Sequence, residues 1–218
     1  MYGGRMRRTA EEAAQTRAEL LDAALFVFAE QGLASARLAD VAQRAGLTRG
    51  ALYHHFADKS ALHAAVMTHS WTTLTEPVWE ILNSRAPLDE RLHGFLTTWL
   101  RRLRQDDRFR ALLTLTVQGS YQAGSSDGQA AKSSALADWR QRLQALFAGH
   151  AALAPGRRPG GADAHQPLTP ESAAAHLLAW LCGTALLAAT DPALLPPGDA
   201  DGVAPALRGL LPPEPMST

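Results

Sequence analysis

Residues 16–62 decide the fold, and they read TRAELLDAALFVFAEQGLASARLADVAQRAGLTRGALYHHFADKSAL. Within them Leu21, Leu25 and Phe28 recur at i, i+4 and i+7, the spacing that places three side chains on one face of an α-helix. Gly32 follows this apolar face, and a glycine in that place is typical of a helix end. The sequence therefore predicts an amphipathic first helix that ends at Gly32.

Two shorter helices come next, and the residues between them predict a tight turn. Apolar side chains share one face of residues 38–45, and Gly46 is expected to end this segment. Thr48 has the hydroxyl that an N-cap needs, and Asp58 is placed to cap a longer fourth helix in the same way. Two short helices joined by a tight turn behind a supporting first helix form a candidate helix-turn-helix unit.

Helical periodicity continues along the chain, whereas no stretch alternates with a period of two for long enough to form a sheet. We therefore expect an all-α fold of about nine helices. The first helix is expected to begin near Thr9, which forms a capping box with Glu12, and Pro77 is expected to kink or break the fourth. Residues 154–168 are rich in Pro, Gly and charge and are expected to form a mobile loop. Later apolar stripes predict helices within residues 88–103, 109–121, 136–147, 173–190 and 203–211.

Composition and charge limit the class of protein. The 218 residues carry 21 Lys and Arg against 21 Asp and Glu, so no net charge is available to coat nucleic acid or membrane indiscriminately. The one cysteine, Cys182, cannot build a disulfide framework or a cysteine zinc finger. We expect no secretory signal, because no apolar stretch follows the arginines of residues 1–8.

The uncharged residues from Ala173 to Thr190 are as many as a short membrane span needs. The run includes His176, however, and its flanks, Glu171 and Asp191, lack a basic anchor. A helix that is apolar on every side is also typical of one buried in its own subunit or against a partner subunit. We expect this second arrangement and no membrane partner.

The beginning of the third helix carries side chains that suit the recognition of DNA. In a helix-turn-helix unit this helix enters the major groove with its N-terminus first. Arg49 can donate two hydrogen bonds to the edge of a guanine, and Gly50 allows a close approach. The hydroxyls of Thr48 and Tyr53 and the imidazole of His54 can bind phosphates. Each also has a structural interpretation, since Thr48 could serve only as a cap and Tyr53 only in packing.

The same stretch closely resembles the N-terminal domain of TetR-family transcriptional repressors. The resemblance rests on LLDAAL and FAEQG in the first helix, DVAQRAG in the second, and the TRGALYHHFADKSAL that follows. EEAAQTR and TRGALY are most similar to the acriflavine and multidrug-efflux branch of that family. The resemblance covers about a fifth of the chain, with glycines, aromatic residues and charges in register.

The resemblance implies a helix-turn-helix domain at residues 1–60, with its recognition helix at about 48–54, and a helical effector-binding and dimerisation domain at residues 61–218. The positions that it assigns to operator DNA are Arg17, Arg37, Thr48, Arg49, Gly50, Tyr53, His54 and Lys59. The amine of Lys59 is expected to be exposed. The chain departs from the family at Ala36-Arg37, where a Thr or Ser is usual. We expect the charge of Arg37 to replace that phosphate contact, while Asp40 and Ser35 help to cap the helix.

The second half of the chain has no arrangement of residues typical of an enzyme, so we expect no catalysis, no cofactor and no metal. Its histidines never lie at i, i+3 or i+4, and it has no glycine-rich phosphate loop. Large aromatic residues recur there, and these could form either a core or a ligand pocket. The candidate ligand-binding residues are Trp99, Phe109, Gln118, Trp139 and His176.

The last helices are the expected site of dimerisation, because small residues there allow two helices to approach closely. The candidate interface residues are Leu178, Gly183, Ala185, Ala189 and Leu207. The main hypothesis is a cytoplasmic homodimeric repressor that a small hydrophobic or amphipathic effector releases from a near-palindromic operator. One alternative is a DNA-binding regulator whose C-terminal half binds a partner and no small molecule. Another is a helical protein of the membrane surface.

Overall fold

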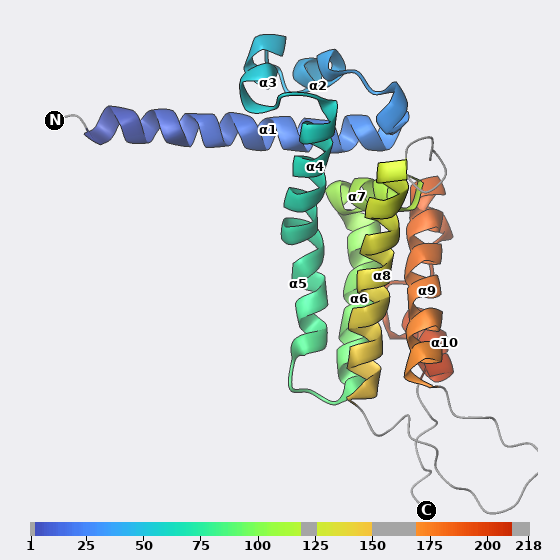
Figure 1. Ribbon diagram of the computed structural model, residues 1–218. Coiled ribbons are helices and arrows are strands. Elements are labelled where there is room, and N and C mark those ends of the chain that lie inside the picture. Colours follow the sequence, from blue (N-terminus) through green and yellow to red (C-terminus); the bar gives the residue numbers. More distant parts are fainter. Residues whose placement is uncertain (1–2, 119–125, 150–168, 211–218) are drawn as a thin grey trace, which may run out of the picture. The chain divides into compact units, whose positions relative to one another are not determined.

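The computed structural model describes residues 3–118, 126–149 and 169–210, and every regular element within these ranges is helical (Figure 1). Counted with α4, η1 and α5 as one interrupted helix, the described residues form nine α-helices. The prediction of an all-α fold is therefore confirmed. The loop expected at residues 154–168 lies outside the described residues, as does Tyr121 at the end of a predicted helix.

Packing divides the chain into two compact units. The first comprises residues 1–77 and 107–122, and the second comprises residues 78–106 and 123–218. The elements of the first unit are α1 (Gly3–Ser35), α2 (Leu38–Arg44), α3 (Arg49–His55), α4 (Lys59–Ser70), the π-helical turn η1 (Trp71–Thr75) and α7 (Asp107–Gln118). The unit thus contains the predicted DNA-binding helices together with α4, most of which follows residue 60, and α7.

The core of the first unit is built from the apolar stripes of its helices. Leu21, Leu25 and Phe28 of α1 are at most 2% exposed, as their spacing predicts. They pack in one cluster with Leu52 of α3 and Leu62 of α4, both fully buried. The inward face of α7 joins the same cluster, and α7 lies against α1. The short helices α2 and α3 are thereby fixed on a common base.

The turn and cap signals in this unit are confirmed. Gly32 has a φ of 74° and interrupts the regular helix, and Gly46 has a φ of 68° in the turn between α2 and α3. Side chains other than glycine rarely adopt such values. The Thr48 hydroxyl accepts a hydrogen bond from the Ala51 N–H at 3.2 Å, and the Asp58 carboxylate caps α4 at 2.7 Å. These caps set where α3 and α4 begin.

The first helix begins earlier than its sequence predicts. It starts at Gly3, so Thr9 and Glu12 lie within the helix and do not form a capping box at its N-terminus. The prediction was wrong because a capping box marks the start of a helix only where the residues before it are not helical. Residues 5–8 are Arg-Met-Arg-Arg, all good helix formers, and no proline precedes Thr9.

The expected interruption near Pro77 is confirmed, and it takes the form of a π-helical turn. In η1 the Glu76 N–H bonds to the Trp71 carbonyl five residues earlier. Proline has no N–H to donate, and its ring clashes with the carbonyl four residues before it, so a wider turn relieves the conflict. The helix continues only as α5 (Glu76–Trp79) and then as the 3₁₀ turn η2 (Glu80–Asn83).

The second unit is a bundle of longer helices. After η2, its elements are α6 (Leu88–Gln105), α8 (Ser126–Ala148), α9 (Pro170–Thr190), the 3₁₀ turn η4 (Pro192–Leu194) and α10 (Ala200–Leu210). Leu92, Phe95, Trp99 and Leu103 of α6 are fully buried, so the predicted stripe faces the core. Helix α8 packs along α9, and α10 packs on α6 (Figure 1).

The uncharged helix of the sequence is α9. By length and composition it could cross a membrane, with a mean hydropathy of 1.6 over its most apolar window, of which 39% is buried within the chain. Seven of its residues are buried against other parts of the chain, among them Ala174, Leu177 and Leu181. Its other face carries Leu186 and Leu187, which are 48% and 38% exposed. One side of α9 therefore packs in the core, and the other side exposes apolar side chains.

Candidate nucleic-acid interface

The outer face of α3 gathers the predicted DNA-reading residues. This helix buries Leu52, and the neighbouring Phe56 is 5% exposed, so one side is fixed to the core. Arg49, Gly50, Tyr53 and His54, together with the N-cap Thr48, are exposed. Positions 49, 50, 53 and 54 are spaced as neighbours on one helical face. The structure thus brings these five residues together on one accessible surface.

On this face an exposed aromatic ring, that of Tyr53, lies next to the guanidinium group of Arg49. Tyr53 is 48% exposed, one of the few large hydrophobic residues that are. The guanidinium carbon of Arg49 lies 6.0 Å from the centre of the Tyr53 ring. An arginine held over an aromatic ring keeps its fork of N–H donors free at the outer edge. The pair therefore presents the guanidinium donors of Arg49 on an exposed face.

Gly50 has no internal packing role. A Cβ atom built at this position would meet only the Thr48 hydroxyl at 3.8 Å, an ordinary van der Waals distance. Gly50 is also helical, with no positive φ. Glycine within a helix costs about 0.5–1 kcal/mol relative to alanine, so its use here is unfavourable for the fold alone. The absence of a side chain at Gly50 leaves open space on the outer surface of α3.

Lys59 differs from its expected environment. Its amine donates hydrogen bonds to the carbonyl oxygens of Ala34 and Ala36 at 3.0 and 3.2 Å, where α1 ends. Lys59 is half-buried, and its amine is held at the end of α1 because carbonyls there lack helical N–H partners and attract a cation. Lys59 ties α4 to the end of α1, and a phosphate contact would have to share its remaining donor.

The other two predicted contacts lie at the edges of this surface. Arg37 is exposed at the N-cap of α2 in an extended conformation, and no side chain caps that helix. The expected help from Asp40 and Ser35 is thus not found. The guanidinium carbon of Arg17 lies 5.3 Å from the centre of the Phe56 ring. Arg17 also lines an open groove of about 520 Å³ beside α4.

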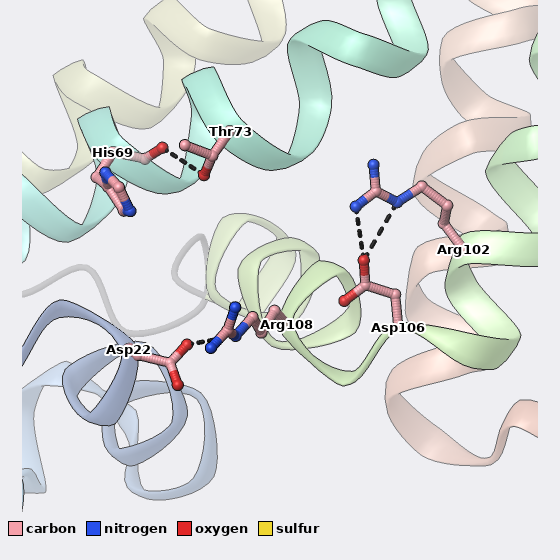
Figure 2. A network of polar contacts seen from close by, with 6 residues as sticks. All are labelled: Asp22, His69, Thr73, Arg102, Asp106 and Arg108. Carbon is pink, nitrogen blue, oxygen red and sulfur yellow. Dashed lines mark hydrogen bonds and ion pairs between the residues drawn. The ribbon is translucent and has the colours of Figure 1, made fainter. Parts of the chain in front are cut away.

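Two acidic residues of α1 form ion pairs with arginines of the same unit. Asp22 forms an ion pair with Arg108 of α7 at 2.6 Å (Figure 2), and Glu30 pairs with Arg44 at 2.6 Å. Arg44 also stacks on Phe26 at 4.9 Å. Because these carboxylates are paired, they subtract less from the positive potential of α3. Figure 2 also shows the ion pair of Arg102 with Asp106 in the second unit, at 2.6 Å.

The predicted effector residues are divided between the two units. Trp99 and Trp139 pack in the second unit, with ring centres 5.8 Å apart, whereas Phe109 is fully buried in the first unit. His176 is exposed on α9, and its Nδ1 lies 2.7 Å from the Ser172 carbonyl oxygen. The side chain of Gln118 lies outside the described residues.

The two tryptophans belong to an aromatic cluster that also contains Trp79 and Phe95. Trp79 lies 5.4 Å from Trp139 and 5.3 Å from Phe95, measured between ring centres. Trp99 donates a buried hydrogen bond from Nε1 to the Thr184 hydroxyl at 3.0 Å, which joins α6 to α9. Phe95 and Trp99 are fully buried and Trp79 and Trp139 are each 5% exposed, so the cluster forms part of the core of the unit.

An open groove lies beside this cluster. It has a volume of about 390 Å³, and its lining includes Trp79, Leu82, Asn83, Arg91, Arg142 and Leu146. These positions are not predicted as a site from the sequence, because they come from four separate elements, α5, η2, α6 and α8. The i, i+3 spacing of Trp79 and Leu82 is the one local signal that they share a face.

On α9 the candidate dimer residues differ in exposure. Gly183 is exposed, whereas Leu178 and Ala189, like Leu207 of α10, are half-buried. Ala185 is only 3% exposed in the single chain, so it packs within its own subunit and adds almost no area to a dimer contact. The neighbouring Leu186 and Leu187 face outward and are 48% and 38% exposed.

Chemically reactive groups are few. Burial raises the pKa of the half-buried Cys182 thiol above its ordinary value, which lowers the fraction of thiolate. No three His, Cys, Asp or Glu side chains gather as a set of metal ligands in the part of the chain that the structure describes. The surface that stands out is therefore the exposed face of α3.

Comparisons with known proteins place the same segment among bacterial regulators. Residues 20–66 match the family of bacterial regulatory proteins named after TetR. The chain is 44% identical over 70 residues to the HTH-type transcriptional regulator AcrR of Shigella flexneri, which covers 32% of this chain and 33% of AcrR. Several of the curated relatives are thus matched over only about a third of their length.

Two further comparisons extend beyond the DNA-binding helices. The chain is 32% identical over 149 residues to the HTH-type transcriptional repressor BepR of Brucella suis, which covers 66% of this chain and 68% of BepR. NalD, the secondary repressor of the MexAB-OprM multidrug efflux pump in Pseudomonas aeruginosa, superposes with a TM-score of 0.68 at 24% identity. That superposition covers 93% of this chain and 98% of NalD, and it shows a common fold.

Proposed function

Because this chain belongs to the TetR family of bacterial regulatory proteins, we propose that it is a homodimeric repressor that a small effector releases from its operator. The observation that carries the proposal is the face of α3, where Arg49, Gly50 and Tyr53 are exposed together. A recognition helix with an accessible arginine at its start is suited to read guanine in the major groove. Sequence specificity then comes from Arg49.

The remaining contacts position the helix on the phosphate backbone. Thr48, Tyr53 and His54 present donors around Arg49, and Arg37 and Arg17 lie at the edges of the surface. Such contacts fix the register of the protein without reading sequence. A dimer that neutralises about eight phosphates should lose affinity with a slope of about −7 in log K against log salt concentration.

The direct test is selection of bound fragments from fragmented genomic DNA, followed by binding titrations over a range of salt. A near-palindromic site with half-sites about 34–36 Å apart, or slightly more, is expected for a two-fold symmetric dimer. Failure to enrich any site at low salt would overturn the proposal. A shallow salt slope would instead contradict the assigned phosphate contacts.

We place the dimer interface on the outward face of α9. Gly183, Leu186 and Leu187 are exposed there, and Leu194 of η4 is 55% exposed. Exposed apolar residues that gather on one helix are typical of an interaction surface. Truncation before Pro170 should then give a monomer with reduced operator affinity, as measured by analytical ultracentrifugation. A truncated chain that remained dimeric would exclude this interface.

The effector is expected to be a small hydrophobic or amphipathic molecule, and the regulator is expected to act in the cytoplasm, where its DNA is. The groove beside Trp79 supports this proposal, since its volume is in the range of small-molecule sites. Family-like coupling between effector and operator would be about 1–3 kcal/mol. If no candidate molecule altered operator binding or tryptophan fluorescence, the second unit would be better explained as a partner-binding module.

A further inference from the structure

The groove beside the aromatic cluster has a marked asymmetry of charge. Arg91 of α6 and Arg142 of α8 both line it, as does Asn83 at the end of η2. No carboxylate is among the lining residues. Each of these side chains carries N–H donors, and the two guanidinium groups are permanently charged. Arg91 already donates a hydrogen bond to the Leu82 carbonyl oxygen, so the groove presents the positive charge of both guanidinium groups and the exposed guanidinium of Arg142.

The acidic residues near this groove lie outside its lining, and they are already bonded. Asp138 pairs with Arg142 at 3.0 Å, one turn away on α8, and Glu80 accepts a hydrogen bond from Asn83 at 3.3 Å. The Arg142 and Asp138 side chains are 44% and 56% exposed. An ion pair that exposed is weak and exchangeable, so another acid could take the place of Asp138 at the guanidinium.

The floor of the groove is aromatic and contains an unsatisfied donor. Trp79 is only 5% exposed, and its Nε1–H is buried without an acceptor among the described residues. A buried tryptophan normally finds a hydrogen-bond partner. The guanidinium carbon of Arg142 lies 5.8 Å from the centre of the same ring. An apolar body in the groove beside Trp79 would therefore bring an attached acid group close to Arg142.

From these observations we infer that the effector is an anionic amphipathic molecule, whose oxyanion binds the exposed guanidinium of Arg142 and whose apolar part enters the groove that Trp79, Leu82 and Leu146 line. This inference rests on the proposed ligand-responsive function. A carboxylate, sulfonate or phosphate shares the required chemistry, since each accepts the paired N–H donors of a guanidinium. A cationic molecule would meet two like charges in the same groove.

The test compares two probes of nearly equal shape, 2-naphthoate and its neutral amide 2-naphthamide, by titration calorimetry on the full chain. Loss of a hydrogen bond to a charged group should weaken binding about tenfold or more, so the amide should bind more weakly than the acid. Arg142→Gln should weaken naphthoate about as much but change naphthamide less than about twofold. Arg140→Gln removes an equal charge from an exposed position of α8 outside the groove lining, and it is the matched control.

A second variant should move affinity in the opposite direction. Asp138→Asn removes the carboxylate that competes for Arg142, so naphthoate should bind about two- to fivefold more tightly. A tighter complex cannot result from damage to the fold, so this variant separates a charge effect from unfolding. Equal binding of acid and amide, equal effects of the Arg142 and Arg140 variants, or no gain from Asp138→Asn would each overturn the inference.

Operator release is measured separately from probe binding. If naphthoate binds as described but leaves the protein–operator complex intact, the anion site stands and the proposed release by an effector at this groove fails. If a neutral hydrophobic compound releases the operator and naphthoate shows no binding, the proposed function stands and the anionic class is wrong. The two failures are thereby distinguishable.

Discussion

Gly50→Ala should have opposite effects on the stability of the fold and on DNA binding. The added methyl group would meet only the Thr48 hydroxyl at 3.8 Å, so no atom of the chain has to move. Alanine in a helix is favoured over glycine by about 0.5–1 kcal/mol. For a chain of this size each kcal/mol raises the melting temperature by about 2–4 °C, which predicts an increase of about 1–4 °C.

On DNA the same methyl group occupies the space through which the start of α3 approaches the groove. Displacement of the Arg49 fork from its base would cost about 1–3 kcal/mol, or about five- to 150-fold in Kd. Thermal melting by circular dichroism and fluorescence anisotropy on the selected operator measure the two effects. Gly94→Ala is a matched control in α6, where a Cβ atom would lie 3.4 Å from the Ile81 side chain. It should also stabilise the helix but leave DNA affinity unchanged.

The reasoning would be refuted if Gly50→Ala bound the operator as tightly as the parent chain. Gly50 would then have no role in approach to DNA. A fall in melting temperature would contradict the other half of the prediction, because it would mean that the position has an internal packing constraint.

Three further changes test individual contacts. Arg49→Ala should cost about 1–3 kcal/mol of operator affinity and relax preference at one base pair, as read by competition with single-base variants of the operator. Lys59→Ala should lower the free energy of unfolding by about 1.5–3 kcal/mol in urea titrations, since two carbonyls at the end of α1 lose a charged donor. It should also weaken binding to all sequences about equally, and unchanged stability would exclude the tie between α1 and α4. Thr184→Val leaves the buried Nε1–H of Trp99 without its acceptor and should cost about 1–3 kcal/mol, whereas Thr190→Val on the exposed side of α9 should cost much less.

Much of the first unit could be predicted because its signals are local. The apolar stripe of Leu21, Leu25 and Phe28, the glycine at position 46 and the caps at Thr48 and Asp58 each act within a few residues. The start of α1 was missed because a capping box is also compatible with a helix interior. The environment of Lys59 was missed because its partners are carbonyl oxygens more than twenty residues earlier.

The candidate effector site shows more clearly which features the sequence does not predict. Helical periodicity shows that Trp99 and Trp139 face inward, but it gives no distance between one helix and another. The structure places both rings in a packed cluster and opens a groove beside Trp79 instead. The structure also buries Ala185 within the chain. The sequence does not predict this, because a helix that is apolar on all sides gives no sign of which face is covered.

The sequence alone thus determined the helical class, the two-helix DNA-reading unit and the residues on its outer face, because spacing along a helix fixes which side chains are neighbours. Tertiary packing decided where Lys59 directs its amine, how α7 joins the DNA-binding unit, and which side chains line the groove. These features depend on contacts between residues far apart in the chain, and such contacts follow from the shapes of whole helices as they pack, which no short stretch of sequence specifies.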